Sequence, residues 1–170
     1  GFTHLTGEPG GPPQHMNYPL GDVVAGLFGA FAIGTALAER NSLPLEEQKG
    51  AEIDLSATEA MARLLDPLAA EYRIGGVVRE RTGSRATYTG PSNVFRAADD
   101  VWFTLVGTGG PIFARICRAI GREDLLGDAR FADNAARIRN LEALVGIIAD
   151  WCASPPFARL AARLDQEEVS

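Results

Sequence analysis

The stretch Tyr18-Pro-Leu-Gly-Asp-Val-Val-Ala-Gly26 decides the fold of this chain, because it places one carboxylate, Asp22, at the start of a long apolar helix. Residues 23–37 include no charged side chain, and the next charges are Glu39 and Arg40. A helix that is apolar on all faces is either buried in a large core or spans a membrane. This apolar run is shorter than the ~20 residues that a membrane span needs. The pattern therefore predicts a buried core helix from about Asp22 to Arg40.

Two interpretations of Asp22 follow from its position. Aspartate is favoured at helix N-termini, because its oxygens accept hydrogen bonds from free backbone N–H groups and its charge complements the helix dipole. Spacing alone favours such an ordinary cap, which is the commonest use of an aspartate ahead of an apolar run. The alternative is a carboxylate that is held for chemistry, and spacing leaves both interpretations open.

The composition bounds the class of protein. The chain has 170 residues, enough for one ordinary domain or parts of two, with 46% hydrophobic and 22% charged residues, as in globular proteins. A net charge of −6 and scattered arginines argue against a nucleic-acid partner. Cys117 and Cys152 lie far apart in apolar helical patterns, which indicates buried thiols in a reducing compartment, the cytoplasm. His4 and His15 form no cluster with zinc spacing, so no metal site is expected.

The two ends of the chain lack the usual start and stop signals. The sequence has no initiator Met and no signal-peptide pattern, and it stops directly after a helical pattern. We therefore expect an internal piece of a longer protein.

The rest of the first half contains one further strand and one further helix by pattern. Apolar and polar residues alternate over 51–56, which predicts a short strand. Ser56 and Glu59 then fit a capping box, which opens a helix that runs to about Tyr72.

The second half reads as a small α+β unit behind a linker. Residues 75–92 are polar, glycine-bearing and rich in Arg, which is typical of a linker. The glycine-rich turn of residues 107–111 ends a strand and starts a helix, with Pro111 expected at the first helical position. The patterns predict strands over 93–97 and 101–106, and later helices over 141–152 and 156–164.

Four segments together resemble the class III CoA-transferase family, also called the CaiB/BaiF family. Residues 1–9 resemble its GLMSLTGEP stretch, and residues 18–26 resemble its P(I/L)GD…G element. Residues 48–56 resemble its GxGQxVDVSL stretch. The most specific segment is 128–137, Asp-Ala-Arg-Phe-Ala-Asp-Asn-Ala-Ala-Arg, which matches DPRFATNAAR almost position for position, with Ala129 in place of the usual Pro.

The resemblance spans essentially the whole chain and implies its fold. It implies an α/β protein, a fragment of the class III CoA-transferase fold that combines part of a Rossmann-like large domain with a small α+β domain. Residues 1–74 would be the large-domain part with the core helix and the nucleophile, 75–92 the linker, and 93–170 the truncated small domain. The family also implies an interlocked homodimer.

The same resemblance implies a function and a site. Asp22 falls on the family's nucleophilic aspartate, which carries CoA as an aspartyl-CoA thioester between an acyl-CoA donor and a carboxylic acid acceptor. Gly21 beside it, and Gly90 in the region that corresponds to the family's glycine-rich loop, are implied as substrate-binding residues. No permanently bound cofactor is implied, because coenzyme A enters as a thioester substrate. Most CoA-binding residues of the family come from a segment ahead of residue 1.

Two alternatives to the transferase remain. The superfamily includes racemases or epimerases of 2-methylacyl-CoA, in which the equivalent aspartate and an upstream histidine exchange the α-proton. That histidine would precede residue 1, and His15 lies in a Gly/Pro loop, so the transferase-like Leu5-Thr-Gly-Glu-Pro9 favours transfer. The second alternative is an inactive fragment that serves only folding and association. Neither a nucleic acid nor a membrane is expected as a partner.

Overall fold

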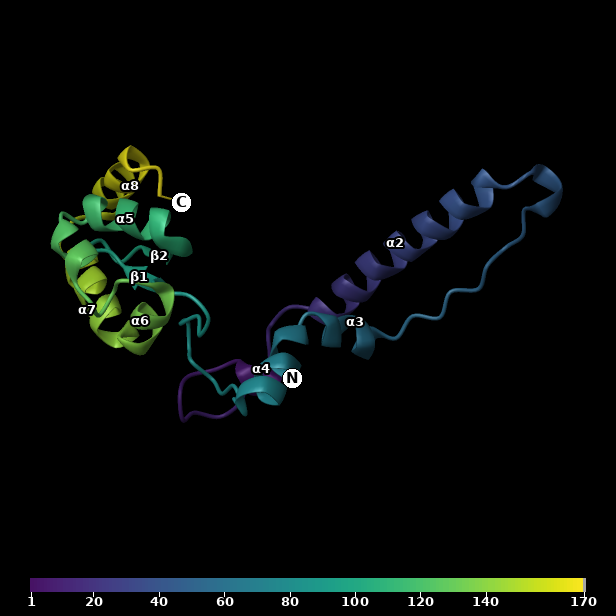
Figure 1. Cartoon of the computed structure of the whole chain (residues 1–170), viewed down its shortest axis with the longest axis horizontal. Helices are drawn as coiled ribbons and strands as arrows, with labels where there is room; N and C mark the ends of the chain where they lie inside the picture. The colour runs from purple at the N-terminus through teal and green to yellow at the C-terminus, as the bar shows by residue number, and fades with distance from the viewer. Residues whose placement is uncertain (170) are drawn as a thin grey trace. The chain divides into compact units, whose positions relative to one another are not determined.

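A computed structural model describes residues 1–169 and divides the chain into two compact units. Unit 1 is Gly1–Arg81 and unit 2 begins at Thr82, and each is described here by itself. Unit 1 contains α1 (Phe2–Leu5), α2 (Leu20–Ser42), the short 3₁₀ helix η1 (Leu45–Glu47), α3 (Ala57–Arg63) and α4 (Asp66–Gly75). Unit 2 contains β1 (Ser92–Arg96), β2 (Trp102–Val106), α5 (Gly109–Ala119), η2 (Glu123–Gly127), α6 (Asn134–Arg139), α7 (Leu141–Cys152) and α8 (Phe157–Gln166) (Figure 1).

The predicted long helix forms, but the prediction that it is buried is wrong for the described residues. Helix α2 packs against α3, and Val24 is its buried residue. By contrast, Leu27 is 66% exposed and Phe31 is 75% exposed. A helix that is apolar on all faces needs apolar neighbours around it. After α2 the chain turns through η1 and returns in an extended conformation to α3, which leaves most of the helix surface uncovered (Figure 1).

Helix α2 is also longer than the uncharged stretch 23–37 from which it was predicted. The helix has 23 residues and a mean hydropathy of 1.7 over its most apolar window, which meets the length and composition of a membrane-crossing helix. The expectation that the apolar segment is too short to span is therefore wrong. Core helices of soluble proteins meet the same criteria.

The segment that follows α2 differs from its pattern in two places. Residues 51–56 form no strand, because no second strand in the described part of unit 1 offers a hydrogen-bonding edge. The expected single helix to Tyr72 is two helices, since the ring of Pro67 clashes with the carbonyl four residues earlier, at Arg63, where α3 ends. The Ser56 half of the capping box is confirmed: the Ser56 hydroxyl accepts a hydrogen bond from the Glu59 N–H at 3.3 Å.

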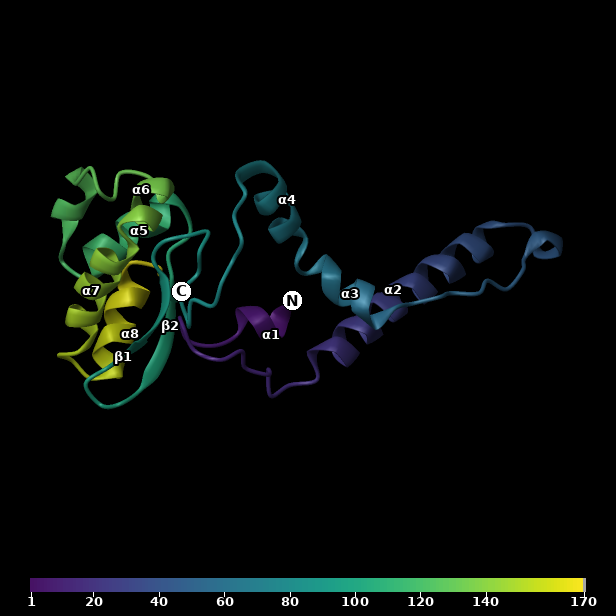
Figure 2. The ribbon, with the colours of Figure 1, turned by 90° about the horizontal axis from the view of Figure 1, so that it is seen from below.

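Unit 2 is a β-hairpin packed on helices. Strands β1 and β2 pair antiparallel with Phe95 opposite Phe103, so both predicted strands are confirmed to within one residue. Figure 2 shows the hairpin along one side of the unit, with α7 and α8 beside it. Pro111 occupies the third position of α5 rather than the first, because the helix already begins at Gly109, whose φ of +82° suits glycine.

The core of unit 2 joins the hairpin to three helices. Phe95 and Leu105 from the strands pack with buried side chains of α5, α7 and α8. These helix residues are Phe113, Ile116, Cys117, Leu144, Ile148, Cys152, Leu160 and Leu164. Fully buried aliphatic side chains contribute about 1.5–3 kcal/mol each by leaving water, so this unit has a hydrophobic core of its own.

A buried arginine ties the start of unit 2 to α6. Arg137 is 2% exposed, and its Nε donates to the Gly90 carbonyl at 2.8 Å while its Nη1 donates to the Phe131 carbonyl at 3.1 Å. Its guanidinium lies 4.6 Å from the centre of the Phe113 ring. Burial lowers the pKa of Arg137 from its ordinary value, with the charge of Asp133 opposing that shift. The cation is thus held by carbonyl dipoles and an aromatic face.

One turn earlier on α6, Asn134 holds the same segment. Its Nδ2 donates to the Tyr88 carbonyl at 2.9 Å, and its Oδ1 accepts from the Gly90 N–H at 3.2 Å. We call Asn134 and Arg137 the α6 clamp. Both residues come from the segment 128–137 that sequence analysis singled out, so this motif serves to fix residues 88–90 onto the small unit.

We expect Arg137→Met to destabilise the protein by about 2–4 kcal/mol, because it leaves two buried carbonyls without a donor. Arg139→Met is the matched control, since Arg139 is exposed at the end of the same helix. Urea unfolding followed by tryptophan fluorescence measures the difference. Equal free energies of unfolding for the two variants would contradict a stabilising role of the Arg137 hydrogen bonds.

The two cysteines are confirmed as free and buried. Burial raises the pKa of Cys117 from 9.0 to about 11 and that of Cys152 from 9.0 to about 12. At pH 9 the folded chain should hold roughly fiftyfold less thiolate than the unfolded chain at Cys117 and roughly five-hundredfold less at Cys152. Because the folded state keeps these protons, stability should fall as pH rises from 9.0 through about 11.

Iodoacetamide labelling at pH 9, read by peptide mass mapping, tests this prediction. Both cysteines should react slowly with iodoacetamide in buffer and rapidly in about 8 M urea, which unfolds the chain. Rapid labelling of the folded chain at either position would show that the thiol is accessible.

Candidate active site

Asp22 lies in the first turn of α2, as its third residue. The residue that precedes the helix is Pro19, and it makes no side-chain capping bond. Within residues 1–169 the Asp22 carboxylate accepts no hydrogen bond and forms no ion pair, and the residue is exposed. The capping hydrogen bond that spacing favoured is therefore not found among the described residues, whereas the charge of Asp22 in the first turn does complement the helix dipole. What remains is a carboxylate at the positive end of a helix dipole, with its oxygens available.

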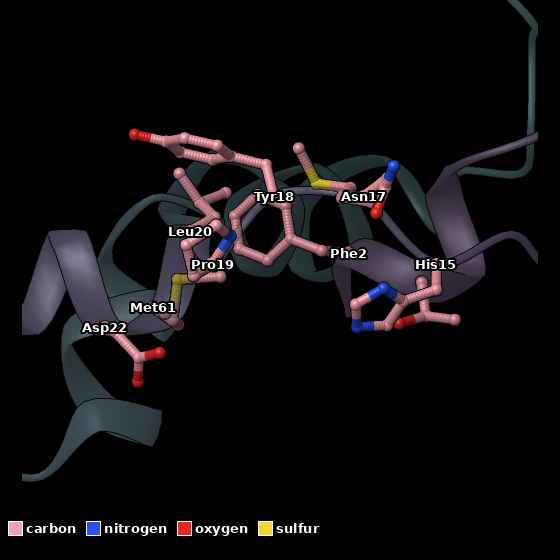
Figure 3. A pocket seen from close by; sticks show the side chains of 11 residues that line it. Phe2, His15, Asn17, Tyr18, Pro19, Leu20, Asp22 and Met61 are labelled. Atoms are coloured by element: carbon pink, nitrogen blue, oxygen red, sulfur yellow. The ribbon is translucent and has the colours of Figure 1, made fainter.

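The carboxylate borders a pocket of about 560 Å³ in unit 1. The pocket is formed by α1, the loop that leads into α2, the first turn of α2 and one residue of α3 (Figure 3). Its lining residues are Phe2, Thr3, His15, Met16, Asn17, Tyr18, Pro19, Leu20, Gly21, Asp22 and Met61. A volume of this size falls within the range of ligand sites.

Gly21 lies beside Asp22 in this wall, as the sequence implied. A Cβ placed on Gly21 would lie 3.9 Å from the Met61 side chain, so the first turn of α2 faces α3 here. The structure thus brings Gly21 and Asp22 to one pocket. Their role in binding substrate stays a prediction.

The loop before α2 folds through short-range hydrogen bonds that set the pocket wall. The Tyr18 N–H donates to the Met16 carbonyl at 2.8 Å, and the Leu20 N–H donates to the Tyr18 carbonyl at 2.8 Å. The Gln14 N–H donates to the Thr6 carbonyl at 2.9 Å and so fastens this loop to the end of α1. Residues 15–19 therefore hold a defined path past the start of α2.

The far side of α1 is fixed by residues near the end of unit 1. Arg81 donates to the His4 carbonyl at 2.7 Å, and the His4 ring pairs with Glu80 at 3.1 Å. Of the two histidines, His4 is thus engaged outside this pocket. His15 lines the same pocket as Asp22, which the Gly/Pro-rich sequence around it did not predict.

Gly90, the third implied site residue, belongs to unit 2. It is buried, and the α6 clamp engages both its N–H and its carbonyl. A Cβ at this position would lie 3.1 Å from Leu141 Cδ1, which explains why glycine stands there. The structure assigns Gly90 a packing role, and its contact with substrate stays a prediction.

Sequence reasoning missed the apolar walls of the pocket. Phe2 and Met61 are far apart in sequence, and nothing in their local patterns indicates that both line a pocket at the start of α2. Among residues 1–169, no group of three or more His, Cys, Asp or Glu side chains is arranged to hold a metal ion.

The chain is similar in sequence to known CoA-transferases. The model of CoA-transferase family III matches residues 1–170. Succinyl-CoA–D-citramalate CoA-transferase of Chloroflexus aurantiacus is 31% identical over 169 residues, which cover 99% of this chain and 41% of that protein. The α subunit of succinyl-CoA–L-malate CoA-transferase from the same organism is 31% identical over 170 residues, 39% of its length. The chain thus spans about two fifths of these relatives.

A solved structure agrees with the sequence relatives. The crystal structure of a CaiB/BaiF family protein from Brucella suis aligns with a TM-score of 0.69 and 27% identity, over 99% of this chain and 43% of that protein. Residues of both units lie within the matched range. The chain belongs to CoA-transferase family III.

Proposed function

We propose that the protein transfers CoA from an acyl-CoA thioester to a carboxylic acid, with Asp22 as the nucleophile. The observation that carries this proposal is the Asp22 carboxylate, which borders a pocket at the head of α2 and is engaged by no other described side chain or backbone donor. Membership in CoA-transferase family III supports the reaction type.

The proposed reaction begins when an Asp22 oxygen attacks the thioester carbonyl of the donor. A C–O bond forms and the C–S bond breaks, which gives a mixed anhydride and CoA thiolate. The thiolate then attacks the aspartyl carbonyl, forming the aspartyl-CoA thioester and releasing the donor acid. Splitting the transfer into covalent steps lowers each barrier.

The second half of the reaction repeats these steps in reverse order. The acceptor carboxylate attacks the aspartyl thioester and releases CoA thiolate, leaving a second mixed anhydride. The thiolate attacks the acceptor carbonyl, which yields the new acyl-CoA and restores the Asp22 carboxylate. Because donor, enzyme and acceptor all contribute carboxyl groups, the exchanges are nearly isoenergetic, and no external oxidant, reductant or nucleotide is needed.

The chain spans about 41% of a relative's length, so we assign this activity to the complete reading frame and expect the 170-residue chain alone to be inactive. We further propose that the enzyme is a homodimer. The buried free thiols support a cytoplasmic location.

In the complete protein, Asp22→Asn should lower CoA transfer by about thousandfold or more, because it removes the nucleophile and keeps its size. With acyl-CoA present, hydroxylamine should trap the aspartyl thioester of the wild type, and peptide mass mapping should place the hydroxamate on Asp22. Asp66→Asn is the matched control, as the first-turn aspartate of α4 in the same unit. Full activity of Asp22→Asn, or a hydroxamate at another residue, would refute the mechanism.

A 2-methylacyl-CoA racemase is the second candidate, and one observation favours considering it: His15 and Asp22 line the same pocket. A racemase needs acid–base groups on the two faces of the α-carbon. If the protein is a transferase, 2-methylacyl-CoA in D₂O should gain no deuterium at the α-carbon, as measured by mass spectrometry. Deuterium uptake without CoA transfer to any acid would reverse the assignment.

A further inference from the structure

Unit 2 contains a cavity of its own at the junction of α6 and α7. Its volume is about 600 Å³, within the range of small-molecule sites. Residues 82 and 85–87, ahead of β1, form one wall, and residues 138–143, which end α6 and begin α7, form the other. We call it the α6–α7 cavity. Every residue that lines it belongs to unit 2.

Hydrogen bonds hold both walls of the α6–α7 cavity in place. The Arg85 N–H donates to the Thr82 carbonyl at 3.2 Å, and the Thr82 hydroxyl donates to the Arg85 carbonyl at 2.7 Å. In the other wall, the Asn140 Nδ2 donates to the Ala136 carbonyl at 2.9 Å and to the Arg130 carbonyl at 3.2 Å. The side chains that line the cavity therefore start from fixed positions on the backbone.

Two arginines line this cavity, and neither is closely paired with an acid. The Arg85 Nη1 lies 3.4 Å from the Glu142 Oε1, which is longer than the usual 2.7–2.9 Å of about every charge-assisted N–H···O bond. The Arg85 side chain is 33% exposed and that of Glu142 is 88% exposed, so the arginine belongs to the wall and its partner extends into solvent. Arg139 is exposed and forms no hydrogen bond or ion pair with the described residues.

Other arginines of unit 2 are held more tightly by acids. Their ion pairs have N–O distances of 2.6–3.0 Å, and they are Arg96, Arg115, Arg118, Arg122 and Arg130. Among the described residues, Arg85–Glu142 is thus the longest ion pair of the unit. The lining carries two arginines and one glutamate, a net charge of +1, in a chain whose net charge is −6. The cavity therefore presents positive charge that is only partly neutralised.

We propose that the α6–α7 cavity binds the phosphate group of a small molecule. A phosphate monoester carries a charge of about −1.5 to −2 at pH 7 and three acceptor oxygens. Guanidinium groups match it with parallel N–H donors, which Arg85 and Arg139 supply, and the Thr87 hydroxyl in the same lining offers a further donor. Ile138 and Leu141 add apolar surface for the organic part of the molecule.

Glu142 competes with the phosphate for Arg85. An ion pair that is mostly exposed contributes little to stability, so its displacement by a dianion costs little. The 3′-phosphate of CoA and a free phosphate ester share this chemistry, and separate probes distinguish the two sources.

Isothermal titration calorimetry of the complete protein with inorganic phosphate, at low ionic strength, tests the proposal. The wild type should bind phosphate with a Kd of about 1 mM or tighter. Arg85→Gln and Arg139→Gln should each raise that Kd about tenfold, as expected for loss of a charge-assisted hydrogen bond. Arg159→Gln is the matched control, since Arg159 is an exposed residue of α8 outside the cavity, and it should change the Kd less than about twofold.

Glu142→Gln separates recognition from structure. It removes the competing carboxylate and should lower the Kd for phosphate by about twofold to fivefold, a gain that damage to the fold would not produce. Adenosine 3′,5′-bisphosphate is the second probe. If it binds more tightly than phosphate and Arg85→Gln removes the difference, the site holds the nucleotide end of CoA. Equal or weaker binding assigns the site to free phosphate esters.

Three results would overturn the inference. They are no binding of phosphate to the wild type at about 10 mM, a loss of affinity in Arg159→Gln as large as that in Arg85→Gln, and weaker binding by Glu142→Gln. Calorimetry measures binding alone, so each of these results leaves the proposed CoA transfer by Asp22 to its own test.

Discussion

The need to cover apolar surface gives the two units of this chain different characters. In unit 2, Leu105, Ile116 and Ile148 lie within one core and are almost completely buried, because the hairpin and its helices enclose one another. In unit 1, α2 is apolar on all faces but has α3 as its packed neighbour, and Phe31 remains 75% exposed. The same hydrophobic effect thus completes one unit and leaves the other with a large apolar helix face.

Local patterns predicted what local forces determine. The N-cap at Ser56, the two strands of the hairpin and the helix Leu141–Cys152 follow from side-chain chemistry within a few residues, and the structure has each of them. The prediction of a strand over 51–56 was wrong. An alternating pattern forms a strand only beside a partner strand, and no partner strand lies within the described part of unit 1. Pro67 was overlooked as the break between α3 and α4.

The candidate site shows a similar division. Asp22 was identified because its motif is contiguous in sequence, and the resemblance gave it a role that spacing alone did not. The pocket around it is lined by residues of α1, of α3 and of the first turn of α2, which no single window of sequence contains. For the same reason, only the structure shows that His15 and Asp22 line one pocket and that Asn134 and Arg137 bind residues 88–90.

The exposed face of α2 has a consequence for how the protein is made. Leu27, Phe31 and Ile33 face water on a helix that α3 covers only in part. Apolar surface that is uncovered while a chain is synthesised, at about 5–20 residues per second, is prone to aggregation. Such a nascent segment is a substrate for chaperones at the ribosome exit, and the yield of recombinant protein should depend on them more than the stability of the finished small unit suggests.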